Sequence, residues 1–194
     1  ALILTFDAVL AIPFAKLRLN NRAFAFAGCC HSLSEKAHRC QMTALVWLRH
    51  DLRLRDNPAL FKAAALEEGV VAVYVHCDAY VRLHDQSAAQ RDFIRRHLHI
   101  LRTDLAELNI PLLVNLVEKP AQIAPEILRL AQSLNAGHCF FNAAYPVNEL
   151  NRDMAVNQLL REQGIAVKRC HDRCIVPPGM VRNGQGEPYK VFTA

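Results

Sequence analysis

The chain has 194 residues, of which 52% are hydrophobic and 21% charged, and its net charge is +5. This length and balance suit one domain with a buried core and exclude an intrinsically disordered chain. Residues 1–41 supply three of the five charges, so residues 42–194 carry only +2. So small a charge gives no electrostatic reason to expect that this part of the chain binds nucleic acid.

Residues 1–41 differ from the rest of the chain. Met42 has the character of a translation start and directly precedes the first expected strand. We expect residues 1–41 to be upstream read-through or an unstructured leader; a transit peptide is the alternative, because the segment contains Arg and few acidic residues. Asp7 and Lys16 interrupt its apolar runs. No run in the chain approaches the roughly 20 apolar residues that span a bilayer, so we expect no membrane segment.

From Met42 onward, short apolar runs alternate with longer amphipathic ones, as in βαβ units. The expected strands are rich in Val, Ile, Leu and Phe without polar alternation, which is typical of a parallel sheet buried on both faces. They are residues 44–49, 70–76, 111–117, 138–141 and 165–169. The expected helices are residues 58–68, 87–108, 121–135 and 147–163. The sequence therefore predicts an α/β fold with a doubly wound, Rossmann-like, five-stranded parallel sheet.

Residues at the helix ends support these boundaries. Asp56 or Asn57 is expected to cap the first helix, with Pro58 in its first turn. Gly69, Gly137 and Gly164 each follow an expected helix, where a left-handed glycine closes the last turn. After residue 174 the chain turns to Pro, Gly and polar residues with no sixth unit. We therefore expect one domain over residues 42–174 and the start of an interdomain linker over residues 175–194.

A doubly wound sheet binds ligands at the carboxyl ends of its strands. The chain has neither a Gly-x-Gly-x-x-Gly fingerprint nor a P-loop, which argues against dinucleotide binding and P-loop chemistry. It also lacks a Gly-x-Ser-x-Gly elbow and a His-Glu-x-x-His pair, so no catalytic residue is predicted. Seven Cys residues without disulfide spacing indicate reduced thiols and a cytoplasmic protein. Cys170 and Cys174 have no second ligand pair for zinc, so no metal site is predicted.

Three motifs carry further information. The first, residues 45–60 (LVWLRHDLRLRDNPAL), passes from an apolar run into alternating Arg and Asp before a helix begins. A solvated turn with local charge pairs, each worth about 0–1 kcal/mol, would explain it in structural terms. The second is residues 145–153 (YPVNELNRD), and the third comprises residues 175–179 (IVPPG) and 186–193 (GEPYKVFT). Together these motifs resemble, in the same order, those of the DNA photolyase and cryptochrome family.

The resemblance implies a protein of two domains with different functions. In this family an N-terminal α/β domain holds a light-harvesting antenna chromophore, and a larger helical domain binds FAD and damaged DNA and performs the photochemistry. We therefore expect the antenna domain of a photolyase that repairs cyclobutane pyrimidine dimers, a carbon–carbon lyase, acting as a monomer. The helical domain is expected beyond Ala194, so this chain alone should be inactive. A cryptochrome blue-light photoreceptor is the alternative, and a stand-alone nucleotide-binding module is a more remote one.

The resemblance also assigns a site. In the folate-using branch of the family, the Asn-Glu pair of the second motif, here Asn148 and Glu149, contacts the pterin ring of 5,10-methenyltetrahydrofolate. A carboxylate can accept hydrogen bonds from the pterin's amine and adjacent ring N–H together. The alternative is that Asn148 caps a helix and Glu149 stabilises its first turn. Relatives that bind a deazaflavin use other parts of the domain, so the identity of the antenna stays open.

Overall fold

The structure is a computed structural model that describes residues 42–66 and 68–189. The expected leader, residues 1–41, and the last five residues of the expected linker lie outside the described residues. Within the described part, no helix is both long enough and apolar enough to cross a membrane.

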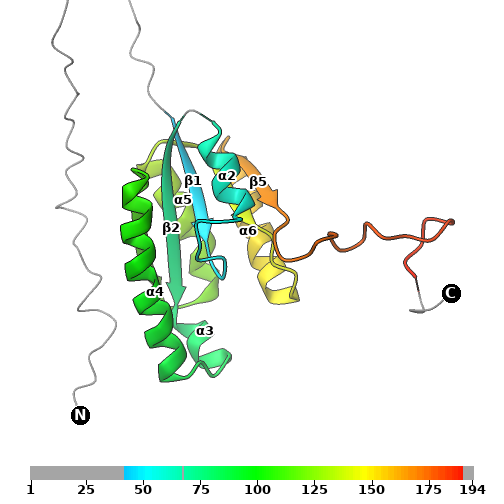
Figure 1. Ribbon diagram of the computed structural model, residues 1–194, viewed down its shortest axis with the longest axis horizontal. Coiled ribbons are helices and arrows are strands. Elements are labelled where there is room, and N and C mark those ends of the chain that lie inside the picture. Colours follow the sequence, from blue (N-terminus) through cyan, green and yellow to red (C-terminus); the bar gives the residue numbers. More distant parts are fainter. Residues whose placement is uncertain (1–41, 67, 190–194) are drawn as a thin grey trace, which may run out of the picture. The chain divides into compact units, whose positions relative to one another are not determined.

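Five parallel strands form one sheet (Figure 1). They are β1 (Thr43–Leu48), β2 (Gly69–Cys77), β3 (Leu112–Val117), β4 (Ala136–Asn142) and β5 (Ala166–Cys170). Their order across the sheet is β3-β2-β1-β4-β5, and every neighbouring pair is parallel. The predicted doubly wound parallel sheet is confirmed. Because the chain reverses direction across the sheet after β3, the carboxyl ends of β1 and β4 flank the switch point where such sheets bind ligands.

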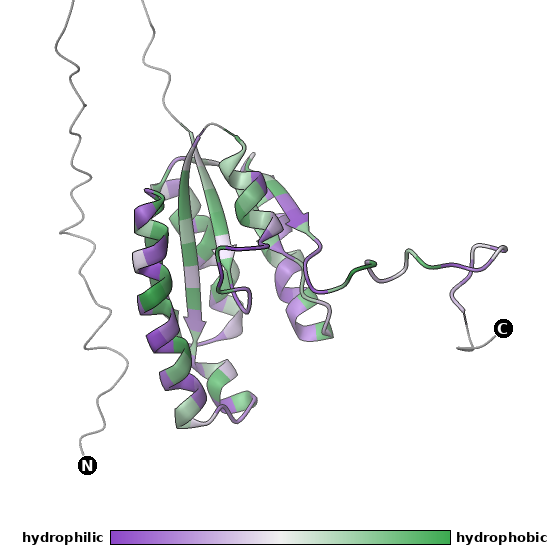
Figure 2. Cartoon of the chain, in the orientation of Figure 1, coloured by the Kyte–Doolittle hydropathy of each residue, from purple (hydrophilic) through white to green (hydrophobic). Residues whose placement is uncertain are grey.

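Helices cover both faces of the sheet. They are α2 (Pro58–Ala64), α3 (Asp78–Leu83), α4 (Ala88–Glu107), α5 (Ile123–Ser133) and α6 (Val147–Glu162), with a 3-10 turn at Pro120–Gln122. Successive side chains of β1 point to opposite faces. Val46 and Leu48 pack in a core with α2 and α4, whereas Leu45 and Trp47 pack in a second core with α5 and α6. Figure 2 shows the corresponding hydropathy, with apolar strands at the centre and polar residues on the outer helix faces.

The helix ends confirm some expectations and correct others. Asn57 caps α2, because its Oδ1 accepts a hydrogen bond from the Leu60 N–H at 3.2 Å. Gly164 has a φ of 75° and follows α6 as predicted. The same expectation is wrong for Gly69 and Gly137, which lie within β2 and β4. Asn135, with a φ of 50°, takes the left-handed position before β4 instead, since Asn tolerates that conformation better than most residues.

Candidate functional site

A buried polar network fixes the loop between β1 and α2. Asp51, Asn57 and Asn142 are only 7%, 3% and 4% exposed. Asn142, the last residue of β4, donates from its Nδ2 to Asp51 Oδ2 at 2.6 Å and accepts at Oδ1 from the Ala59 N–H at 3.1 Å. The other carboxylate oxygen of Asp51 accepts from the Arg49 N–H at 2.9 Å. The network therefore holds the first motif against the end of β4, at the switch point of the sheet.

A buried ion pair joins the first motif to the second. The Arg49 guanidinium, whose side chain is 8% exposed, pairs with Asp153 of α6, which is 2% exposed. It lies 4.6 Å from the centre of the Trp47 ring, and burial lowers the pKa of Arg49 while Asp153 opposes that effect. Arg152 pairs with the same carboxylate at 2.9 Å and lies 5.0 Å from the Trp47 ring. Asp153 thus holds two guanidinium groups at the N-terminal half of α6.

These contacts overturn the interpretation of the first motif as a solvated turn with local pairs. Arg49 finds its partner 104 residues away, and Arg53 pairs with Asp172, 119 residues away. Arg49 and Arg53 therefore join the motif to distant segments, which a local reading of the sequence could not reveal. No three His, Cys, Asp or Glu side chains among the described residues are placed to hold a metal ion.

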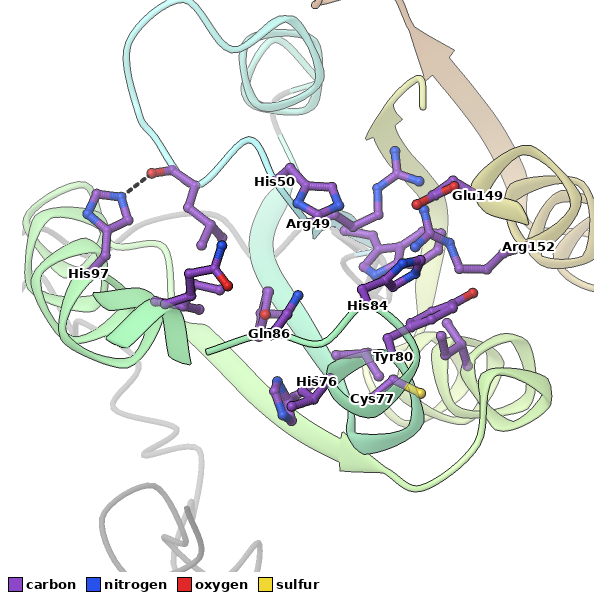
Figure 3. A pocket seen from close by; sticks show the side chains of 18 of the residues that line it. Arg49, His50, His76, Cys77, Tyr80, His84, Gln86, His97, Glu149 and Arg152 are labelled. Atoms are coloured by element: carbon purple, nitrogen blue, oxygen red, sulfur yellow. Dashed lines mark hydrogen bonds between the residues drawn. The ribbon is translucent and has the colours of Figure 1, made fainter. Parts of the chain in front are cut away.

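A cavity of about 580 Å³ opens at this edge of the sheet (Figure 3). Its walls come from the β1–α2 loop, the end of β2, and helices α3, α4 and α6. Glu149, Arg152 and Tyr80 lie together on one side in Figure 3. His97 of α4 lies on the opposite side, where it is hydrogen-bonded to the Leu52 carbonyl. Arg49, Arg53 and Arg152 all reach the cavity wall, but each is paired with a carboxylate.

The two predicted site residues face different hollows. Glu149 is half-buried and lines the first cavity. Asn148 is exposed and lines a second cavity of about 380 Å³, bounded by α3, the 3-10 turn, α5 and α6. The expectation that Asn148 caps the helix is wrong: Pro146 occupies the N-cap position and Asn148 is the second residue of α6. Glu149 does lie in the first turn, as the structural alternative requires.

Helix α3 contributes to the site and was not among the elements predicted from the sequence. This six-residue helix was absent from the predicted elements, because it is too short for an apolar period to stand out. It brings Tyr80 to both cavities and His84 to the first. The two rings are 5.6 Å apart in a tilted contact. No sequence pattern used in the prediction marks this helix.

His76 makes the stability of this edge depend on pH. Its side chain is buried, and burial lowers its pKa below the ordinary 6.5, helped by Arg91 and opposed by Asp78, whose carboxylate is 3.4 Å from Nε2. Because the pKa is lower in the folded state, the unfolded chain takes up a proton first as the pH falls. The contribution of neutral His76 to the free energy of unfolding is therefore fully present above pH 6.5. It is lost as the pH falls below that value.

We expect the His76→Gln variant to lose less stability than the wild type between pH 7.5 and pH 5.5. One titrating group contributes a slope of at most about 1.4 kcal/mol per pH unit. Urea unfolding at the two pH values measures the difference. Equal losses in both proteins would show that His76 does not titrate between the folded and unfolded states in this range.

Comparison with known proteins shows the family of the chain. The family model described as DNA photolyase matches residues 44–194. The chain belongs to the DNA photolyase family. It is 41% identical over 149 residues to the deoxyribodipyrimidine photo-lyase of Vibrio cholerae, covering 77% of this chain and 32% of that protein. A more distant match is cryptochrome-1 of Arabidopsis thaliana, 30% identical over 152 residues, with 78% of this chain and 22% of that protein covered.

The fold is likewise shared with a solved photolyase. The crystal structure of a bacterial class III photolyase from Agrobacterium tumefaciens superposes with a TM-score of 0.65 at 25% identity, covering 84% of this chain and 31% of that one. The chain thus spans about a third of the length of the photolyases that it matches. The superposition shows that the α/β fold is the part in common.

Proposed function

We propose that this chain is the antenna domain of a photolyase that repairs cyclobutane pyrimidine dimers in DNA. The folded domain is residues 42–174, and residues 175–194 begin a linker to a helical domain that binds FAD and damaged DNA. The chain alone then has no repair activity, and the whole protein works as a cytoplasmic monomer. The photolyase assignment is favoured over a cryptochrome receptor by the higher identity to the Vibrio cholerae photolyase, 41% against 30%.

We propose further that the antenna is 5,10-methenyltetrahydrofolate and that Asn148 and Glu149 bind its pterin ring. The supporting observation is the half-buried Glu149 carboxylate on the wall of the 580 Å³ cavity at the carboxyl edge of the sheet. Drug-sized ligands occupy cavities of about 300–1,000 Å³. The donors and acceptors fit as well: the nearby guanidinium groups are paired with Asp153 and Asp172, which leaves Glu149 to accept two N–H groups.

Each residue then has a defined task. The bound folate supplies near-UV absorption and passes its excitation to the flavin. Glu149 orients the pterin by a bidentate hydrogen bond, and the backbone N–H groups at the start of α6, which have no carbonyl partner within the helix, favour a ligand oxygen there. Asn148 provides one more amide at the same helix end. Asp153 keeps Arg152 beside Glu149 through the 2.9 Å ion pair.

Substitution of Glu149 tests the folate site. Glu149→Ala should weaken binding of 5,10-methenyltetrahydrofolate to the chain by about 10- to 100-fold, because charge-assisted hydrogen bonds contribute about 1.5–3 kcal/mol. Glu149→Gln should fall between, since one acceptor remains and the charge is lost. Absorbance titration of the three proteins with the folate gives the dissociation constants. Glu162→Ala, at the exposed far end of the same helix, is the matched control and should bind as the wild type does.

A purely structural role for Glu149 predicts a different result for folate affinity. If Glu149 only stabilises the first turn of α6, its removal costs about 0.3–1 kcal/mol of folding free energy and leaves folate affinity unchanged. Unaltered binding by both Glu149 variants would remove this residue from the site.

A further inference from the structure

The two cavities share a wall. Tyr80 of α3 and Arg152 of α6 line both, and no other residue of the described chain lines both. Glu149 lines only the first cavity and Asn148 only the second. A planar ring that contacts both Asn148 and Glu149 must therefore lie against this shared wall.

Of the two residues of the shared wall, Arg152 is held by an ion pair and Tyr80 by packing. Arg152 follows Asn148 by four residues and Glu149 by three, so it is a neighbour of both on the surface of α6. Asp153 holds it at 2.9 Å, and it lies 5.0 Å from the Trp47 ring. Tyr80 faces α6 from α3, partly buried at the border of the core and in tilted contact with His84. Figure 3 places the Tyr80 ring on the same side of the cavity as Arg152 and Glu149.

The electrostatics of Tyr80 agree with that placement. Burial raises the pKa of its hydroxyl, while the positive charge of Arg152 opposes the shift and the negative charge of Glu149 adds to it. Both charges act on Tyr80 because the three side chains lie close together. The ring thus offers a large, half-exposed aromatic face beside the carboxylate that the folate site requires.

We propose that Tyr80 is the aromatic contact of the antenna site, and that its ring packs against the heteroaromatic ring of the chromophore bound by Asn148 and Glu149. This inference rests on the proposed folate site and adds a residue that determines affinity and ring orientation. Aromatic rings favour offset or edge-to-face contact with one another beyond simple area burial. The contact comes from the ring of Tyr80, and the hydroxyl contributes little.

Three variants of the 194-residue chain test this inference by titration with 5,10-methenyltetrahydrofolate. Tyr80→Phe should keep the wild-type dissociation constant within about two-fold, because the ring remains. Tyr80→Leu should weaken binding by about 10-fold, and the absorption band of the bound folate should shift, because the stacked partner is gone. Phe61→Leu is the matched control: Phe61 is an exposed aromatic residue of α2 that lines neither cavity, and its replacement should leave affinity unchanged.

Thermal unfolding without ligand verifies that each variant folds, and Tyr80→Met is the second variant if Tyr80→Leu does not. Wild-type affinity in Tyr80→Leu, with affinity lost in Glu149→Ala, would overturn the inference and leave the proposed folate site standing. Equal losses of affinity in Tyr80→Phe and Tyr80→Leu, or as large a loss in Phe61→Leu as in Tyr80→Leu, would also overturn it. Absence of folate binding by the wild-type chain and by the full-length protein would overturn both proposals.

Discussion

Replacing Asp153 with Ala should lower the free energy of unfolding by about 3–5 kcal/mol, the usual cost of breaking a buried ion pair from one side. Asp153 is 2% exposed and pairs with Arg49 and Arg152, whose side chains are 8% and 10% exposed. Its removal leaves the buried Arg49 guanidinium with no carboxylate partner. The loss falls on the contact between the first motif and α6, so α6 should also move relative to the sheet edge. Urea unfolding of the chain at pH 7.5 measures the effect.

Two variants accompany this experiment. Asp153→Asn keeps the shape and one acceptor, so its loss of stability should be smaller than that of Asp153→Ala. Asp92→Ala removes an exposed carboxylate that pairs with Arg95 and Arg96 on the surface of α4, and its stability should equal that of the wild type. A loss below about 1 kcal/mol in Asp153→Ala, the range of a surface pair, would mean that Arg49 finds another partner or solvent.

The second large effect is expected at Asn142. Replacing it with Leu should cost about 3 kcal/mol, because a buried group that loses its partner retains its full desolvation penalty. The Asp51 carboxylate loses its 2.6 Å hydrogen bond and the Ala59 N–H loses its 3.1 Å acceptor. The start of α2 and the β1–α2 loop should loosen together. Urea unfolding gives the free energy, and hydrogen exchange at the Ala59 amide reports the local opening.

Asn151→Leu is the matched control for this substitution. It makes the same change of side chain at an exposed position of α6. Its stability should stay close to that of the wild type. If the Asn142 and Asn151 variants unfold alike, the network does not fix the loop, and the role assigned to the first motif is wrong.

Much of the fold could be predicted because local patterns and the tertiary structure agree. Apolar runs such as the Val-rich 70–76 indicated strands buried on both faces, and β2 covers Gly69–Cys77. Asn57 and Pro58 marked the start of α2 through capping and backbone preference. The error at Gly137 arose because both Asn and Gly can adopt the left-handed conformation that ends a helix. Asn135 closes the helix before β4, so Gly137 lies inside the strand.

The site was harder to predict because it depends on residues far apart in the chain. The second motif predicts Asn148 and Glu149 as site residues, but the sequence cannot show that the two face separate cavities. The first motif carried charges whose partners, Asp153 and Asp172, follow more than 100 residues later. Tyr80 lies on a helix of six residues, which is too short to show a periodic pattern of apolar residues. Each of these depends on tertiary packing rather than on local preference.

The most direct test of the account is a crystal structure of the chain bound to 5,10-methenyltetrahydrofolate. We predict that both Glu149 carboxylate oxygens lie within about 3.2 Å of the pterin amine and its neighbouring ring N–H. The pterin ring should lie against Tyr80 at the wall that the two cavities share. A pterin seated at the α4 side of the cavity, against Phe93 and His97 and out of reach of Glu149, would contradict the account.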